Sequence, residues 1–111
     1  MVRFNEKGIQ ELKNSYLHLT KNVLPSLAKD GSRNWPVVED HCFQRIVLDT
    51  ICGGVWYEFI DRPAYKNLTM EQASAAVQLC EAIIDGHSNI QELNQQSLIW
   101  RRKLHRVQNF K

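Results

Sequence analysis

The sequence predicts an all-α protein, a small single-domain bundle of about four helices that spans residues 1–111. Three observations lead to this fold class. Apolar residues recur at steps of three and four residues in successive stretches, which is the spacing of a buried helix face. Two of these stretches follow residue pairs typical of helix starts. The chain has 111 residues and is 43% hydrophobic, which is ordinary for one globular domain.

The first helix is expected to begin near Asn5, because asparagine readily accepts a hydrogen bond from the free amides of a helix start. Its apolar face consists of Ile9, Leu12, Tyr16, Leu19 and Val23. Pro25 lacks an amide hydrogen and crowds the preceding turn, so the helix should kink or restart there. The turn-forming residues 29–33 end this element.

The second helix is expected to follow Pro36, since a proline is tolerated in a first helical turn. Residues 37–52 are apolar around most of the helix circumference, which indicates the central and most buried helix. A β-strand is the competing interpretation, because isoleucine, valine and phenylalanine favour sheets. The length of the stretch and its capped start favour the helix.

An irregular aromatic segment separates the second helix from the third. Gly53 and Gly54 interrupt the apolar pattern, and residues 55–60 hold the densest group of aromatic side chains. This part forms either a short helix or a continuation of the second helix beyond a glycine kink. Pro63 ends it, because the residue before a proline is pushed out of the helical region.

The third and fourth helices have the clearest starts. Thr69 and Gln72 have the spacing of a capping box, and Gly86 is the expected end of the third helix. Ser88 and Gln91 repeat the capping-box spacing at the start of the fourth helix. Because only about two residues join these helices, we expect them to be antiparallel neighbours.

Composition argues against several classes of protein. Cys42, Cys52 and Cys80 have the spacing of neither a zinc site nor a disulfide framework, so free thiols in a reducing compartment are expected. No secretory leader, membrane-spanning apolar stretch or cofactor-binding loop stands out. We therefore expect a cytoplasmic protein with no membrane partner, no metal and no cofactor. The net charge of +2 neither demands nor excludes nucleic acid as a partner.

The first candidate site is a polar stripe on the second helix. His41, Arg45 and Asp49 follow one another at four-residue steps, which places them within about 80° of each other on a helix. A histidine, a guanidinium and a carboxylate in line can bind an anionic ligand or hold a proton-transfer group. The more ordinary interpretation is a ladder of side chains where the helix meets solvent.

The second candidate site combines aromatic and basic residues of the irregular segment. It consists of Trp56, Tyr57, Arg62 and Tyr65. Aromatic rings beside arginine are typical of a protein-interaction hot spot or a ligand pocket. In so small a domain, however, Trp56 and Phe59 are more simply explained as side chains that fill the core.

The third candidate site is the basic end of the fourth helix, which holds Arg101, Arg102, Lys103, His105 and Arg106. Arg102, Lys103 and Arg106 lie opposite its apolar stripe, with Ile99 exposed among them. Such a face suits a phosphate backbone or an acidic protein surface. Cations in a last turn also complement the helix dipole, and solvated basic faces are common. No motif that reads nucleic-acid bases is present.

These observations favour a non-enzymatic binding module that acts through a macromolecular partner, and a protein is the partner we expect. No convergent set of nucleophile, base and oxyanion donors is present, so no catalytic residue is assigned. One alternative is nucleic-acid binding through the basic face. Another is a small enzyme or ligand-binding domain that uses the stripe of His41, Arg45 and Asp49. Association of two copies through a face near Ile99 is also open.

Overall fold

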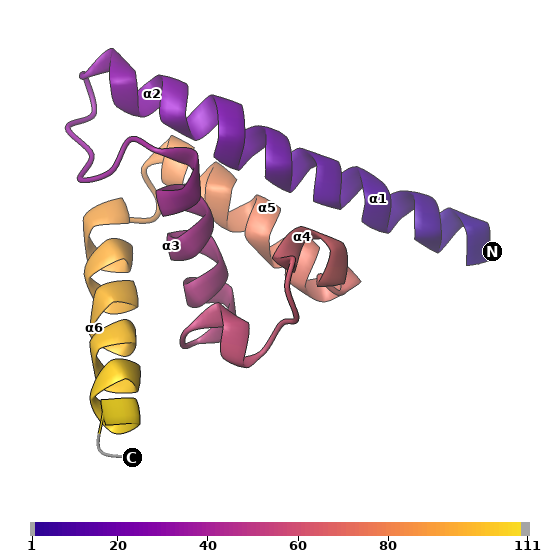
Figure 1. The fold of residues 1–111 in the computed structure, drawn as a ribbon. Helices are drawn as coiled ribbons and strands as arrows, with labels where there is room; N and C mark the ends of the chain where they lie inside the picture. Colours follow the sequence, from indigo (N-terminus) through magenta and orange to yellow (C-terminus); the bar gives the residue numbers. More distant parts are fainter. Residues whose placement is uncertain (1, 110–111) are drawn as a thin grey trace.

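The chain folds as an all-α protein, as the sequence predicts (Figure 1). The computed structural model describes the backbone of residues 2–109 and the side chains of residues 8–106, and no strand occurs in this range. In chain order the elements are α1 (Val2–His18), the π-helical η1 (Leu19–Val23), α2 (Leu24–Asp30), α3 (Asp40–Cys52), the 3₁₀-helical η2 (Trp56–Glu58), α4 (Ala64–Asn67), α5 (Met70–Asp85) and α6 (Ile90–Asn109). The four expected helices are therefore present, with two short ones in the irregular segment.

The first three elements form one continuous rod (Figure 1). The rod begins at Val2, so Asn5 lies inside α1 and the predicted N-cap at this residue is wrong. Pro25 does not end the helix. Instead η1 widens the turn that precedes it, which relieves the clash of a proline ring with the carbonyl group four residues earlier. Gly31 ends α2 in the left-handed conformation, with φ of 84°.

Helix α3 is the central helix, as its apolar circumference predicts. It packs against the rod at η1 and α2, against α5, and against α6. It begins at Asp40, three residues later than the expected start at residue 37, because Pro36 lies in the loop that precedes it. Trp35 in this loop packs edge-on against the buried Phe43, with ring centroids 5.8 Å apart.

Helices α5 and α6 diverge from the short turn that joins them (Figure 1). Helix α5 packs along α1 and α3, whereas α6 packs on α3, so the prediction that they are antiparallel neighbours is wrong. The reason is that both helices find partners elsewhere. The small buried residues Ala73, Ala76 and Cys80 allow α5 to approach its neighbours closely. Helix α6 is tied to α3 by polar side chains, as described below.

The two predicted helix starts have different outcomes. At α5 the capping box is present: the amide of Gln72 donates to the Thr69 hydroxyl at 3.1 Å, and the Thr69 amide donates to the Gln72 side chain at 2.9 Å. At α6 the cap is Asn89, whose side-chain oxygen accepts from the amides of Gln91 and Glu92 at 2.9 and 3.3 Å. The predicted box at Ser88 is therefore wrong, because the adjacent asparagine takes the same role.

The irregular segment between α3 and α5 is held by a few buried side chains spaced along it. Gly53 ends α3 with φ of 71°. Val55, Ile60 and Leu68 are then buried in the core. Phe59 is 61% exposed, so the interpretation that it fills the core is wrong. Trp56 is half-buried and packs against the edge of the core, which leaves part of its ring accessible.

The helices in the described part of the chain are either too short or too polar to cross a membrane.

Candidate functional site

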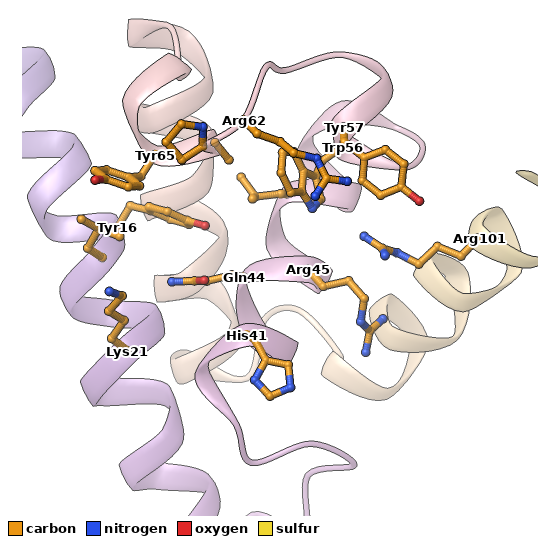
Figure 2. Close-up of a pocket in the computed structure, with 14 residues that line it drawn as sticks. Tyr16, Lys21, His41, Gln44, Arg45, Trp56, Tyr57, Arg62, Tyr65 and Arg101 are labelled. Atoms are coloured by element: carbon orange, nitrogen blue, oxygen red, sulfur yellow. The ribbon is translucent and has the colours of Figure 1, made fainter.

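A groove open to solvent, with a volume of about 680 Å³, lies over α3 and is walled by the rod, the irregular segment and α6 (Figure 2). Of the seven residues in the first two candidate sites, six line this groove. They are His41 and Arg45 from α3, Trp56 and Tyr57 from η2, and Arg62 and Tyr65 from the segment around α4. Two sites proposed separately from the sequence are therefore parts of one.

Three polar lining residues, Tyr16, Lys21 and Gln44, are absent from the sequence-based candidates, and a fourth, Arg101, is assigned from the sequence only to the basic end of the fourth helix. Tyr16 has a place in the apolar stripe of the first helix, which gave no reason to expect its hydroxyl in a site. Arg101 belongs to the basic end of α6, and only long-range packing brings it beside α3. The helical position of Gln44, three residues after His41, is the one local signal that points toward the groove.

Asp49 does not line the groove. Its side chain is fully buried between α3 and α6. It accepts hydrogen bonds from the Ser97 hydroxyl at 2.6 Å, from Arg101 Nε at 2.9 Å and from the Trp56 amide at 3.0 Å. The expected stripe is thus not a ladder at the helix surface, because Asp49 turns to α6 and to the start of η2. Through these bonds the Asp49 carboxylate holds α6 and the start of η2, which form two walls of the groove, without lining the groove itself.

Arg45 also bonds to α6, but only to neutral groups. Its guanidinium donates to the Ser97 hydroxyl at 2.8 Å and to the Asn94 side-chain oxygen at 2.7 Å. Among the side chains of residues 8–106, no carboxylate lies within ion-pairing distance of it. Hydrogen bonds therefore fix the orientation of a half-buried guanidinium whose charge has no counterion, and this group faces the groove.

The groove lining as a whole is positive. It contains Lys21, Arg45, Arg62 and Arg101, and no aspartate or glutamate. Within the described side chains, Arg101 is the one of these four that pairs with a carboxylate, that of Asp49. A concave surface with cations and no acidic side chain attracts anions.

One end of the groove is aromatic. The Arg62 guanidinium lies over the rings of Trp56 and Tyr57, at 5.6 and 4.8 Å from their centroids. Arg101 lies 5.5 Å from the centroid of Tyr57 on the facing wall. Tyr65 completes this end and is 39% exposed. Stacked guanidinium and aromatic planes of this kind offer flat surfaces to a flat ligand.

Tyr16 contributes a hydroxyl to the groove. The residue is only 1% exposed, and its hydroxyl points into the groove (Figure 2). Burial, and to a lesser degree the neighbouring Cys80, raise the pKa of Tyr16, so the hydroxyl stays neutral. It can both donate and accept a hydrogen bond within the groove.

The remaining candidates for chemistry are weaker. His41 lies at the groove rim, with 77% of its side chain exposed. Its ring, Glu39 and Asp40 offer ligand atoms within 4.8 Å of one another, but exposed polar groups gather in this way without a metal. Burial and the charge of Asp49 raise the pKa of Cys52, which is the opposite of what a nucleophilic thiolate requires.

The basic end of α6 has a hollow of its own, with a volume of about 640 Å³. Its lining is Leu98, Arg101, Arg102, His105 and Arg106. Two of the three residues predicted for this surface, Arg102 and Arg106, therefore lie at a concave site. The third, Lys103, is exposed but lies outside both the hollow and the groove.

The sequence matches no family model and no curated protein, and the fold matches no solved structure. The geometry of the groove is therefore the basis for the function proposed below.

Proposed function

We propose that this protein is a binding module whose groove accepts an anionic ligand with a flat, aromatic portion. The observation that carries the proposal is the unbalanced charge of the groove. Lys21, Arg45 and Arg62 lack carboxylate partners among the described side chains, and the lining contains no acidic residue. Arg45 is half-buried, so its charge is costly to leave unpaired, whereas Lys21 and Arg62 are exposed and add electrostatic attraction for an anion.

The dimensions of the groove support a ligand of limited size. A volume of about 680 Å³ falls within the range of sites that hold small molecules. The cations Lys21 and Arg45 and the imidazole of His41 lie toward one end, and the aromatic residues lie toward the other (Figure 2). A ligand with an anionic group at one end and a ring at the other matches this polarity.

The sequence alone ranks a protein partner above a small ligand, and the groove reverses this ranking. The geometry supports the ligand-binding alternative better, with Arg45 and the aromatic residues in contact with the ligand and Asp49 behind them. An acidic segment of a protein is one source of the required charge. It differs from the proposed ligand because a carboxylate has no ring to occupy the aromatic end.

The proposal is tested by calorimetric titration with three compounds: 2-naphthyl phosphate, 2-naphthol and inorganic phosphate. We expect 2-naphthyl phosphate to bind at least about ten-fold more tightly than either fragment, since it alone satisfies both ends of the groove. Replacing an unpaired cation in the variants Lys21→Gln and Arg62→Gln should weaken its binding by about ten-fold each, because a charge-assisted hydrogen bond is lost.

The matched control is Lys29→Gln, which removes an exposed lysine of the same rod outside the groove. Its affinity for 2-naphthyl phosphate should equal that of the unmodified protein. Equal binding of 2-naphthol and 2-naphthyl phosphate, or equal losses in the Lys21 and Lys29 variants, would contradict the proposal.

A further inference from the structure

The groove and the hollow on α6 share one residue. Arg101 lines both, so the two concave surfaces adjoin at this residue. Together they extend from the rod, across α3 and onto the C-terminal half of α6. A ligand confined to the groove would leave the hollow empty, whereas an elongated ligand would occupy both.

The cations continue along this combined surface. Arg102 and Arg106 lie in the hollow, beyond the groove cations, and neither lining contains an aspartate or glutamate. Within residues 8–106, neither arginine forms an ion pair. The whole chain has a net charge of only +2, so positive charge is concentrated on this surface. A track of cations matches an anion that repeats along a chain.

The aromatic end of the groove distinguishes between kinds of polyanion. Nucleobases stack on aromatic rings and on arginine planes, and the rings of Trp56 and Tyr57 with the Arg62 guanidinium supply both surfaces. An acidic peptide has no flat group for this end. A duplex keeps its bases stacked inside, so a groove of this depth reaches a base only in a single strand.

The Tyr16 hydroxyl adds a polar group to the groove lining. It points into the groove, where it can contact a ligand (Figure 2). A neutral hydroxyl that both donates and accepts matches the mixed donors and acceptors of a base edge or a sugar. It is less suited to a cluster of carboxylates, which only accept.

We infer that the ligand is a single-stranded nucleic acid, with one nucleotide in the groove and the adjoining phosphates on the hollow of α6. This inference rests on the proposed function, because the same groove holds the nucleotide. To the proposed function it adds that the ligand is a polymer. It also adds that the strand leaves the groove past Arg101 toward Arg106.

The test is fluorescence anisotropy with a dye-labelled oligothymidine of about ten nucleotides, competed by thymidine monophosphate, by a hairpin duplex and by polyglutamate. The oligonucleotide should bind at least about ten-fold more tightly than the mononucleotide, because it also contacts the hollow. The double variant Arg102→Gln, Arg106→Gln should lose about ten-fold in oligonucleotide affinity and reduce the salt slope by about one.

Lys103→Gln is the matched control, since it removes a cation of α6 that lies outside both surfaces. Its affinity should stay unchanged, and mononucleotide binding should be unchanged in all α6 variants. All three side chains are exposed, so thermal unfolding should confirm that the variants fold normally.

Three results would overturn the inference. Equal affinity for the mononucleotide and the oligonucleotide would show that only the groove binds, and the proposed function would stand. If polyglutamate or the duplex bound more tightly than the oligonucleotide, the ligand would be an acidic protein segment or a duplex and not a single strand. Absence of binding to every nucleotide, together with normal binding of 2-naphthyl phosphate, would reject nucleic acid while leaving the groove as an anion site.

Discussion

Burial determines the chemistry of Cys80. The thiol lies in the core between α5 and its neighbours and is inaccessible to solvent. Desolvation, with a smaller contribution from the charge of Glu81, raises its pKa to about 12. Since an unfolded cysteine has a pKa of about 8.5, the two states bind protons differently in alkaline solution. Cys80 therefore acts as a small apolar side chain at neutral pH and is not a reactive nucleophile.

This difference predicts a loss of stability at high pH. Below about pH 8.5 the thiol is protonated in both states and the pH has no effect through this group. As the pH rises toward 12 the unfolded state loses the proton first, so unfolding becomes more favourable. We expect the free energy of unfolding to fall by about 2 kcal/mol between pH 7 and pH 10 through Cys80 alone.

The measurement is urea unfolding at both pH values for the unmodified protein and for Cys80→Ala. The alanine variant is less stable at pH 7, because it leaves a cavity. It should lose about 2 kcal/mol less than the parent between the two pH values, since it has no thiol to titrate. An identical loss in both proteins would contradict the role assigned to Cys80.

At the scale of the helices, local rules predict the starts and long-range contacts determine the packing. The capping box of Thr69 and Gln72 depends on two residues three positions apart, and the sequence is sufficient to find it. The start of α6 shows how near alternatives compete. Ser88 and Asn89 are both good N-cap residues, and the helix begins one residue later than the sequence suggests.

Neighbouring substitutions should therefore differ at the start of α6. Asn89→Ala should lower the free energy of unfolding by about 1 kcal/mol, because the amides of Gln91 and Glu92 lose their acceptor. Ser88→Ala should change it by less than about 0.5 kcal/mol, since its hydroxyl does not cap the helix. Thermal unfolding of the two variants measures this difference. A larger loss of stability in Ser88→Ala than in Asn89→Ala would mean that Ser88 caps the helix, as predicted from sequence.

At the scale of the whole molecule, the fold is open rather than spherical. Its extents are 48 × 41 × 20 Å and its radius of gyration is 14.7 Å, against about 13 Å for a typical domain of this length. The N-terminal part of the rod and the C-terminal part of α6 project beyond the central α3 (Figure 1). The groove exists because these two arms do not close on each other above α3, and the irregular segment walls its aromatic end.

The sequence contains the parts of this groove but not their assembly. Periodicity places His41 and Arg45 on one face, and composition singles out the aromatic segment. What joins them is Asp49, whose hydrogen bonds reach Ser97 and Arg101, 48 and 52 residues later in the chain. No local spacing signals such a contact. Spacing alone therefore suggested a surface ladder for a residue that is fully buried.

The attachment of α6 gives the last prediction. Asp49 and Arg101 form a largely buried pair, in which the carboxylate is fully enclosed and the arginine side chain is 24% exposed. Asp49→Asn and Arg101→Met should each lower the free energy of unfolding by about 3 kcal/mol, because each leaves a buried polar partner uncompensated. The double variant should lose less than the sum, with a coupling of about 1–3 kcal/mol. Arg102→Met, at the exposed neighbouring position, should change stability by less than about 0.5 kcal/mol.

Hydrogen exchange shows which helices are destabilised when the Asp49–Arg101 pair is broken. Because α6 packs mainly on α3 through these polar groups, weakening the pair should release α6 before the rest of the fold. In Asp49→Asn the amides of α6 should therefore exchange markedly faster, and those of η2 as well, since Asp49 also accepts from the Trp56 amide. The amides of α5, which packs on α1 and α3, should keep most of their protection. Equal acceleration in α5 and α6 would mean that the pair stabilises the whole fold and does not specifically hold the groove wall.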